Sequence, residues 1–164
     1  MARTKRSLMA WSHPVSVAAI PRFRPILVLS NDEASASKGS SQAVRLLVVE
    51  DDYLVGSQVA YALEDEGFVV AAVVTSAEEA IEFTRCEPIA LAIMDVRLAG
   101  ERDGVDCALE LFREHGIRCI FATAHSDEQI KARAEPAQPL AWIQKPYSMA
   151  SLIASVRKTL DSLE

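Results

Sequence analysis

The chain contains at residues 44–52 the stretch Val-Arg-Leu-Leu-Val-Val-Glu-Asp-Asp, an apolar run that ends in three acids. Three later apolar runs are likewise followed at once by a polar side chain. These side chains are Asp95, Thr123 and Lys145, the last of which precedes Pro146. If the runs are parallel strands of one sheet, all four polar signals lie at its carboxyl edge, where open α/β sheets bind their ligands. The pattern therefore predicts one pocket that holds acids, a hydroxyl and an ammonium.

From Val44 onward, short apolar runs alternate with longer amphipathic runs, which is typical of βα units wound into a parallel sheet. Strands are predicted at residues 44–49, 68–74, 89–94, 117–122 and 140–144. Helices are predicted at residues 53–66, from Thr75 or Ser76 to about Cys86, at 105–115, at 126–134, and after Ser148. Asp103-Gly104 is predicted to form a turn. The fold class predicted from this order is α/β, with five strands and five helices.

The chain divides into a short basic part and a longer acidic part. Residues 1–42 carry six Lys/Arg against two acids, whereas residues 43–164 carry eleven against twenty-one. Residues 30–42 are rich in Ser, Ala, Asn, Gly and Lys, which is the composition of a flexible linker. We therefore expect a flexible or disordered N-terminal extension at residues 1–42 and one folded domain at 43–164. A start codon placed too far upstream is another origin of the extension, and a lone strand at residues 26–29, crowded by Pro21 and Pro25, is the alternative reading.

Composition also disfavours several classes of protein. An acidic body without a basic stripe repels phosphates, so direct nucleic acid binding is not expected. The longest apolar run of the extension, residues 15–20, is far too short to cross a bilayer and has no signal-peptide pattern around it. Cys86, Cys107 and Cys119 lack metal-ligand spacing and suggest reduced thiols. We therefore expect a cytoplasmic protein.

Glu50 and Asp51 directly follow the first predicted strand. Two adjacent carboxylates repel each other unless a cation lies between them, and oxygen ligands alone favour Mg²⁺. The commoner alternative is that these acids, together with Asp52, only cap the first helix. The triplet by itself leaves both a magnesium site and a helix cap open.

Asp95 ends the third predicted strand, which carries no charge and is expected to be central in the sheet. An unpaired carboxylate there costs free energy unless something compensates it, and a carboxylate can be the nucleophile that accepts a phosphoryl group. Thr123 could donate its hydroxyl to that group, and Lys145 could bridge acid and phosphate. Pro146 is a candidate for a cis peptide bond that directs the lysine. The alternatives are a loop cap, a strand-end threonine and a solvated lysine.

These residues resemble the receiver domain of two-component response regulators, and the resemblance covers residues 44–163. It rests on Leu-Leu-Val-Val-Glu-Asp-Asp, Ile-Met-Asp, the Asp-Gly turn, Ala-Thr-Ala and Lys-Pro, which stand in the family's order and near its spacing. The resemblance implies a flavodoxin-like (βα)5 fold, a five-stranded parallel sheet with strand order 2-1-3-4-5.

The resemblance also implies a role for each matching residue. Asp95 matches the phosphoacceptor. The implied Mg²⁺ ligands are Asp51 directly, Glu50 through water, Asp95, and the backbone carbonyl of Arg97. The implied phosphate-binding and switch residues are Thr123, Ala124, Lys145 and the aromatic Trp142. Arg97 and His125 flank the site, and we expect them to modulate the lifetime of the phosphoryl group.

The sequence departs from the family's pattern around the loop that follows Asp95 and at the switch aromatic. The loop is one residue longer than the usual form, and Ala99 stands where a proline is common. Trp142 is larger than the usual Tyr or Phe. These departures bear on the third metal ligand and on the inward swing of the aromatic ring.

The implied function is that of a stand-alone receiver, which takes a phosphoryl group from a sensor histidine kinase or a histidine phosphotransfer protein with the help of Mg²⁺. It would signal to a downstream protein through a changed interaction surface and lose the phosphoryl group slowly, without enzymatic turnover. The apolar face of the last helix leaves a homodimer open. The alternatives are a non-phosphorylated pseudo-receiver, a Mg²⁺-dependent phosphohydrolase, and a flavin-binding protein, whose phosphate the acids would repel.

Overall fold

The structure is a computed structural model that describes residues 44–124 and 128–162. The predictions for the N-terminal extension at residues 1–42 and for His125 lie outside the described residues. Within the described ranges, no helix combines the length and the apolar composition needed to span a bilayer.

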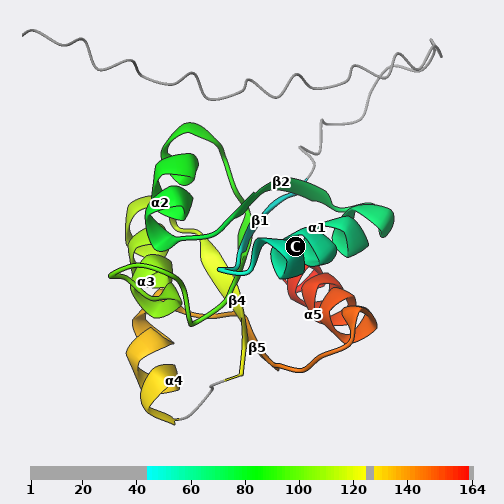
Figure 1. Cartoon of the computed structure of the whole chain (residues 1–164). Coiled ribbons are helices and arrows are strands. Elements are labelled where there is room, and N and C mark those ends of the chain that lie inside the picture. Colours follow the sequence, from blue (N-terminus) through cyan, green and yellow to red (C-terminus); the bar gives the residue numbers. More distant parts are fainter. Residues whose placement is uncertain (1–43, 125–127, 163–164) are drawn as a thin grey trace, which may run out of the picture. The chain divides into compact units, whose positions relative to one another are not determined.

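Five parallel strands form one sheet, in the order β2-β1-β3-β4-β5 (Figure 1). The strands are β1 (Arg45–Val49), β2 (Val69–Val74), β3 (Leu91–Met94), β4 (Arg118–Thr123) and β5 (Ala141–Gln144). The helices are α1 (Tyr53–Asp65), α2 (Ala77–Cys86), α3 (Gly104–His115), α4 (Glu128–Ala134) and α5 (Met149–Asp161), with a 3-10 turn η1 (Glu135–Ala137) after α4. The predicted α/β class and the strand order are confirmed.

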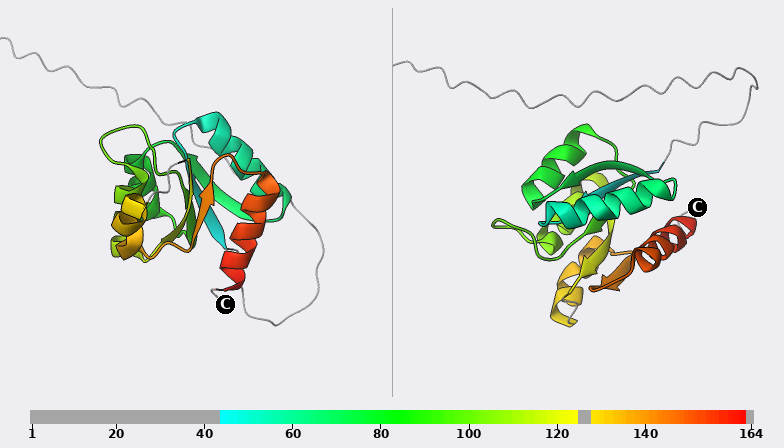
Figure 2. Two further views of the ribbon diagram at one scale, coloured as in Figure 1. Left: turned by 90° about the horizontal axis from the view of Figure 1, so that it is seen from below. Right: turned by 45° about the vertical axis from the view of Figure 1, so that its right-hand side comes forward.

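The sheet lies between two layers of helices. α1 and α5 cover one face, and α2, α3 and α4 cover the other (Figure 1, Figure 2). Residues along β1 alternate between the layers: Leu46 and Val48 belong to the core under α1 and α5, and Leu47 and Val49 to the opposite core. Because side chains alternate with a period of two, a slip of one residue would exchange the two faces. The core therefore fixes the register of β1 and the position of Glu50 just beyond it.

The predicted turn at Asp103-Gly104 is wrong, because these residues begin α3 instead. Asp103 is the N-cap residue, and its carboxylate accepts hydrogen bonds from the backbone N–H groups of Val105 and Asp106, both at 3.0 Å. These bonds satisfy donors that have no partner within the helix. Gly104 is therefore the first residue of α3.

Gly104 also brings α3 into direct contact with the end of β3. Its N–H donates to the carbonyl of Val96 at 2.8 Å. A Cβ atom at this position would lie 1.8 Å from the carbonyl oxygen of Asp95 and 3.1 Å from the Cγ atom of Met94. Any larger residue would have to displace the backbone of Asp95. The position of this acid therefore requires glycine at residue 104.

We expect Gly104→Ala to lower the free energy of unfolding by about 1–3 kcal/mol, since the added methyl group overlaps backbone atoms that have nowhere to move. Urea denaturation would measure the change. Glu114→Ala, an exposed substitution near the other end of α3, is the control and should stay within about 0.5 kcal/mol of the unmodified chain. An alanine that stabilised the protein, as it does at an ordinary helical glycine, would contradict the proposed overlap.

Candidate functional site

The parallel register brings the ends of β1 and β3 side by side. Val49 pairs with Met94, and the N–H of Asp95 donates to the carbonyl of Val49 at 2.9 Å. The N–H of Glu50 donates in turn to the carbonyl of Val74, at the end of β2. Glu50 and Asp95 therefore follow neighbouring strands at the carboxyl edge of the sheet.

Three of the predicted acids converge at this edge. Glu50, Asp51 and Asp95 each offer a carboxylate oxygen, and these atoms all lie within 4.8 Å of one another. Glu50 and Asp95 are buried, whereas Asp51 is exposed. Asp52 has the other role that the sequence left open, because its carboxylate caps α1 by accepting from the N–H groups of Leu54 and Val55. The acidic triplet is thus divided between a cluster and a helix cap.

Lys145 joins two of the clustered acids. Its Nζ atom lies 2.6 Å from Glu50 Oε2 and 2.6 Å from Asp95 Oδ2. Burial alone would lower the pKa of the Lys145 ammonium, but its hydrogen bonds to Asp95 and Glu50 outweigh burial and raise that pKa. The lysine is therefore held in its charged form by the carboxylates that it contacts.

One ammonium does not balance three carboxylates. Burial is the main cause that raises the pKa of Glu50, and the negative charges of Asp95 and Asp51 raise it further against the effect of Lys145. The cluster therefore retains surplus negative charge next to its lysine. A divalent cation bound among these oxygens would relieve that repulsion.

The remaining predicted residues surround this cluster. Asp95 Oδ1 accepts a hydrogen bond from the N–H of Arg97 at 3.1 Å. Thr123 is fully buried at the end of β4, and its carbonyl accepts from the N–H of Lys145 at 2.9 Å. Ala124 is exposed next to Thr123. The peptide bond between Lys145 and Pro146, the candidate cis bond, is cis.

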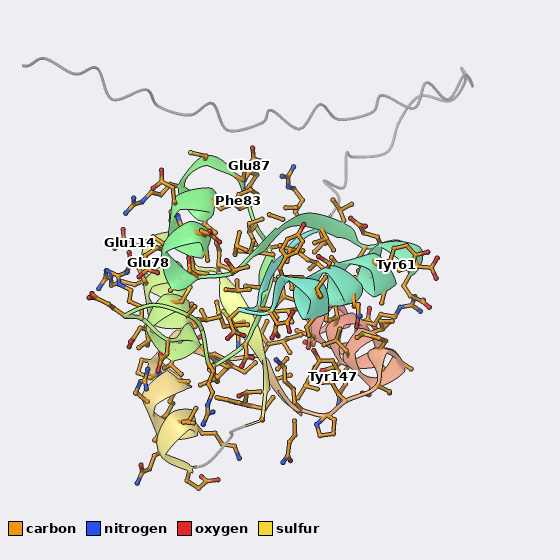
Figure 3. All side chains as sticks on the ribbon, viewed as in Figure 1. Tyr61, Glu78, Phe83, Glu87, Glu114 and Tyr147 are labelled. Atoms are coloured by element: carbon orange, nitrogen blue, oxygen red, sulfur yellow. The ribbon has the colours of Figure 1, made fainter. Side chains whose placement is uncertain are left out.

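A cavity of about 540 Å³ adjoins the acids. It is lined by Glu50, Asp52, Val55, Ala124, Lys145, Pro146, Tyr147 and Met149. The sequence reasoning missed the apolar part of this lining, Val55, Tyr147 and Met149. The position of Tyr147 directly after Lys145-Pro146 was a signal that could have identified it, and Figure 3 shows its side chain beside the chain segment that leads into α5.

Trp142, the candidate switch aromatic, is stacked rather than free. Its ring lies 4.5 Å from that of Phe121, at an interplanar angle of 20°. Phe121 is fully buried on β4, and Trp142 is partly buried opposite it on β5. The larger ring is accommodated by this stack.

The long loop between Asp95 and Asp103 is anchored to neighbouring elements through Ala99 and Arg102. Ala99 forms an isolated parallel bridge with Ser76, just before α2. Arg102 pairs with Glu110 at 2.6 Å and with Glu78 at 4.0 Å. The extra residue and the missing proline therefore occur in a loop that α2 and α3 hold in place.

The three cysteines are free thiols. Cys107 and Cys119 are buried, and burial raises the pKa of Cys107 to about 12 and raises that of Cys119 still more strongly. Cys86 is exposed. The two buried thiols are thus packing residues and not nucleophiles.

Comparison with known proteins agrees with this geometry. Residues 46–157 match the family model of the response regulator receiver domain. The chain is 31% identical over 112 residues to the transcriptional regulatory protein PdtaR of Mycobacterium tuberculosis, covering 68% of this chain and 54% of that one. It is 25% identical over 130 residues to the phyllosphere-induced regulator PhyR of Methylorubrum extorquens, covering 79% and 48%. The chain thus spans about half the length of these relatives.

A solved structure shows the same fold. The CheY-like response regulator receiver domain protein of Methanospirillum hungatei superimposes with a TM-score of 0.67. The two sequences are 24% identical, and the match covers 73% of this chain and 94% of the other. At this identity the likeness concerns the fold.

We expect Mg²⁺ to stabilise the protein, and we expect Asp51→Asn to remove most of that stabilisation, because one of the three clustered carboxylates is lost. In the presence of a chelator, the same substitution should raise the free energy of unfolding by about 0.5 kcal/mol, since it relieves repulsion at a partly solvated site. Urea denaturation with and without Mg²⁺ would measure both effects.

Asp52→Asn is a charge-matched control for this experiment. It removes the same charge one residue away and keeps a side chain that caps α1 well. This control should respond to Mg²⁺ as the unmodified chain does. An equal response of the two variants would show that the acids act only through net charge.

Proposed function

The chain belongs to the response regulator receiver domain family, and we propose that Asp95 accepts a phosphoryl group from a phosphohistidine on a partner protein. Receiver domains are signalling domains, so the chemistry serves a switch and not the turnover of a metabolite. The observation that carries the proposal is the contact of Lys145 with both Glu50 and Asp95, at 2.6 Å each, inside one acidic cluster.

The donor set of the cluster fits Mg²⁺. Its carboxylate oxygens are hard ligands, they are few, and the exposed Asp51 leaves room for bound waters. We propose that Glu50, Asp51, Asp95 and the backbone carbonyl of Arg97 hold the ion, with Glu50 acting through water. When bound, the ion would neutralise charge on the transferring phosphoryl oxygens.

The reaction itself is an exchange of one bond to phosphorus for another. A carboxylate oxygen of Asp95 attacks the phosphorus, the P–N bond to the donor imidazole breaks, and the imidazole leaves with the electron pair of that bond and takes a proton from water. Lys145 donates a hydrogen bond to Asp95 Oδ2 before the transfer, and its ammonium can then pair with a phosphoryl oxygen. The product is an acyl phosphate on Asp95, which water cleaves slowly.

The added charge would then change the surface of the domain. Thr123 lies at the end of β4, where its hydroxyl could bond the phosphoryl group, and the small Ala124 leaves space beside it. Trp142 already stacks on Phe121, so we propose that the indole moves little and that α4 carries the larger change. Arg97, together with His125, would set the access of water and the lifetime of the phosphoryl group.

The surface of α1 next to the cavity suits a protein donor. Leu54 and Tyr61 are 72% and 73% exposed, unusually high for large apolar side chains. They line a groove of about 490 Å³ together with Met149, which also lines the cavity beside the acids. Figure 3 shows Tyr61 on α1. Because the groove and the cavity share Met149, we propose that the phosphohistidine protein docks here.

The main alternatives have less support. A pseudo-receiver would not need an ammonium shared by two buried acids, and the long loop with Ala99 is anchored to Ser76. A phosphohydrolase would need an acid or base near Asp95 that is free to activate water. Arg97 and the buried Val96, which directly follow Asp95, supply none, and the nearby Glu50 and Asp51 are the proposed ligands of the ion. The cytoplasmic location, the downstream partner, a homodimer and the stand-alone organisation remain predictions.

We expect incubation with acetyl phosphate and Mg²⁺ to form a base-labile adduct that Asp95→Asn abolishes, because the amide is not a nucleophile. Lys145→Ala should slow the transfer while keeping Asp95 available. Mass spectrometry of the intact chain would detect the adduct, with Asp161→Asn on α5 as the control that remains active. Absence of an adduct on the unmodified chain would favour the pseudo-receiver, and continuous release of phosphate would favour the phosphohydrolase.

We expect Leu54→Glu to slow phosphoryl transfer from a phosphorylated histidine phosphotransfer protein about tenfold or more, since a side chain that docking would bury becomes charged. Transfer from acetyl phosphate should be unchanged, because the small donor does not need α1. Glu82→Gln on α2, on the other face of the sheet, is the control. Equal slowing with both donors would place the effect of Leu54 in the site itself and not in docking.

A further inference from the structure

Arg133 of α4 forms an ion pair across to the beginning of α3. Its Nη2 atom donates to Asp103 Oδ1, and the same atom lies 3.3 Å from Asp106 Oδ1. Asp103 Oδ1 is also the acceptor that caps α3. Burial raises the pKa of Asp103, but the hydrogen bond from Arg133 and the capping bonds outweigh it and lower that pKa. One carboxylate oxygen thus serves both the helix cap and the guanidinium.

The α3 side of this pair is rigidly attached to the acidic site. Asp103 directly precedes Gly104, whose N–H bonds the carbonyl of Val96 and whose backbone leaves no room for a Cβ atom against the carbonyl of Asp95. A shift of Asp103 would therefore disturb the chain on either side of the phosphoacceptor.

Among the described residues, the α4 side is attached to the core through little buried apolar surface. Ala134 is the buried residue of this short helix, and Ile130 packs against the core while partly exposed. Within the described residues, the ion pairs that join α4 to another helix are the two of Arg133, since Lys131 pairs with Glu128 of the same helix. A helix with so little buried apolar surface is among the elements that shift at low cost in free energy.

We propose that the ion pair between Arg133 and Asp103 is a latch that holds α4 in its phosphate-free arrangement and so sets the threshold of the switch. The inference rests on the proposed function, in which charge on Asp95 draws Thr123 inward and shifts α4, the next element of the chain. An interaction present in one of two states favours that state by its own free energy. Loss of the pair must therefore favour the phosphorylated arrangement.

Loss of this ion pair should strengthen ligand binding, which is the opposite of what damage to a domain does. If removing the latch makes the switched state easier to reach, it must also tighten the binding of whatever stabilises that state. Damage to the domain would loosen binding instead. Because both partners are partly exposed, with 46% and 33% of their side chains accessible, we expect a change of about two- to fivefold.

The test is a titration of the full chain with beryllofluoride, a phosphoryl mimic, in the presence of Mg²⁺. Trp11→Phe leaves Trp142 as the single tryptophan, and Trp142 packs against the core that includes Ala134 of α4, so its fluorescence reports on this region. In this background, Arg133→Ala should bind beryllofluoride about two- to fivefold more tightly. Arg133→Lys, which keeps the charge, should restore part of the original affinity.

Lys131→Ala is the matched control, because it removes the same charge from the same helix but only an ion pair within that helix. Asp103→Asn keeps a capping side chain and should tighten binding as Arg133→Ala does. The double variant should show less than the product of the two single effects. Urea denaturation would verify that each variant is folded.

The latch would be overturned if Arg133→Ala bound beryllofluoride no more tightly than Lys131→Ala, or more weakly than the parent chain. The proposed function would be contradicted by a different result. Either the parent chain would not bind beryllofluoride, or Asp95→Asn would bind it equally well. The two failures are therefore distinguishable in one set of titrations.

Discussion

The crowding of three carboxylates around one ammonium is the constraint on which the site depends. Glu50 and Asp95 are buried beside each other, Asp51 adds a third charge, and Lys145 contacts two of the three. Such a cluster lowers the stability of the fold unless a further cation joins the ammonium, because the carboxylates repel one another at short range. In the proposed function, this loss of stability is the cost of a site arranged for Mg²⁺ and a phosphoryl group.

The scaffold turns this local constraint into a defined geometry. The alternation of β1 between two cores fixes its register, and parallel pairing with β3 then places Glu50 and Asp95 at one edge. Gly104 fixes the position of Asp95 from a third element, because α3 can approach the carbonyl of Asp95 only where there is no Cβ atom. The core and the site are therefore parts of one packing arrangement, and a change in α3 is felt at the acid.

In the proposed function, the two sides of the domain contact different partner proteins. The exposed apolar residues of α1 and the cavity beside Lys145 lie on the side of the proposed donor. The lightly buried α4, tied to α3 by Arg133, lies over the other face of the sheet (Figure 1). The phosphoryl donor and the downstream partner can then bind separate surfaces, with the acidic cluster between them at the edge of the sheet.

The sequence by itself determined the α/β class, the place of each strand and helix, and the residues that gather at the sheet edge, because hydrophobic periodicity and strand-end polar residues are local signals. It could not decide which acid of Glu50, Asp51 and Asp52 caps α1, nor that Asp103-Gly104 begins a helix, because both depend on where the neighbouring N–H groups point. The stack of Trp142 on Phe121 and the pair of Arg133 with Asp103 join residues 21 and 30 positions apart. Such contacts form only when β5 lies beside β4 and α4 beside α3, so the tertiary structure alone decides them.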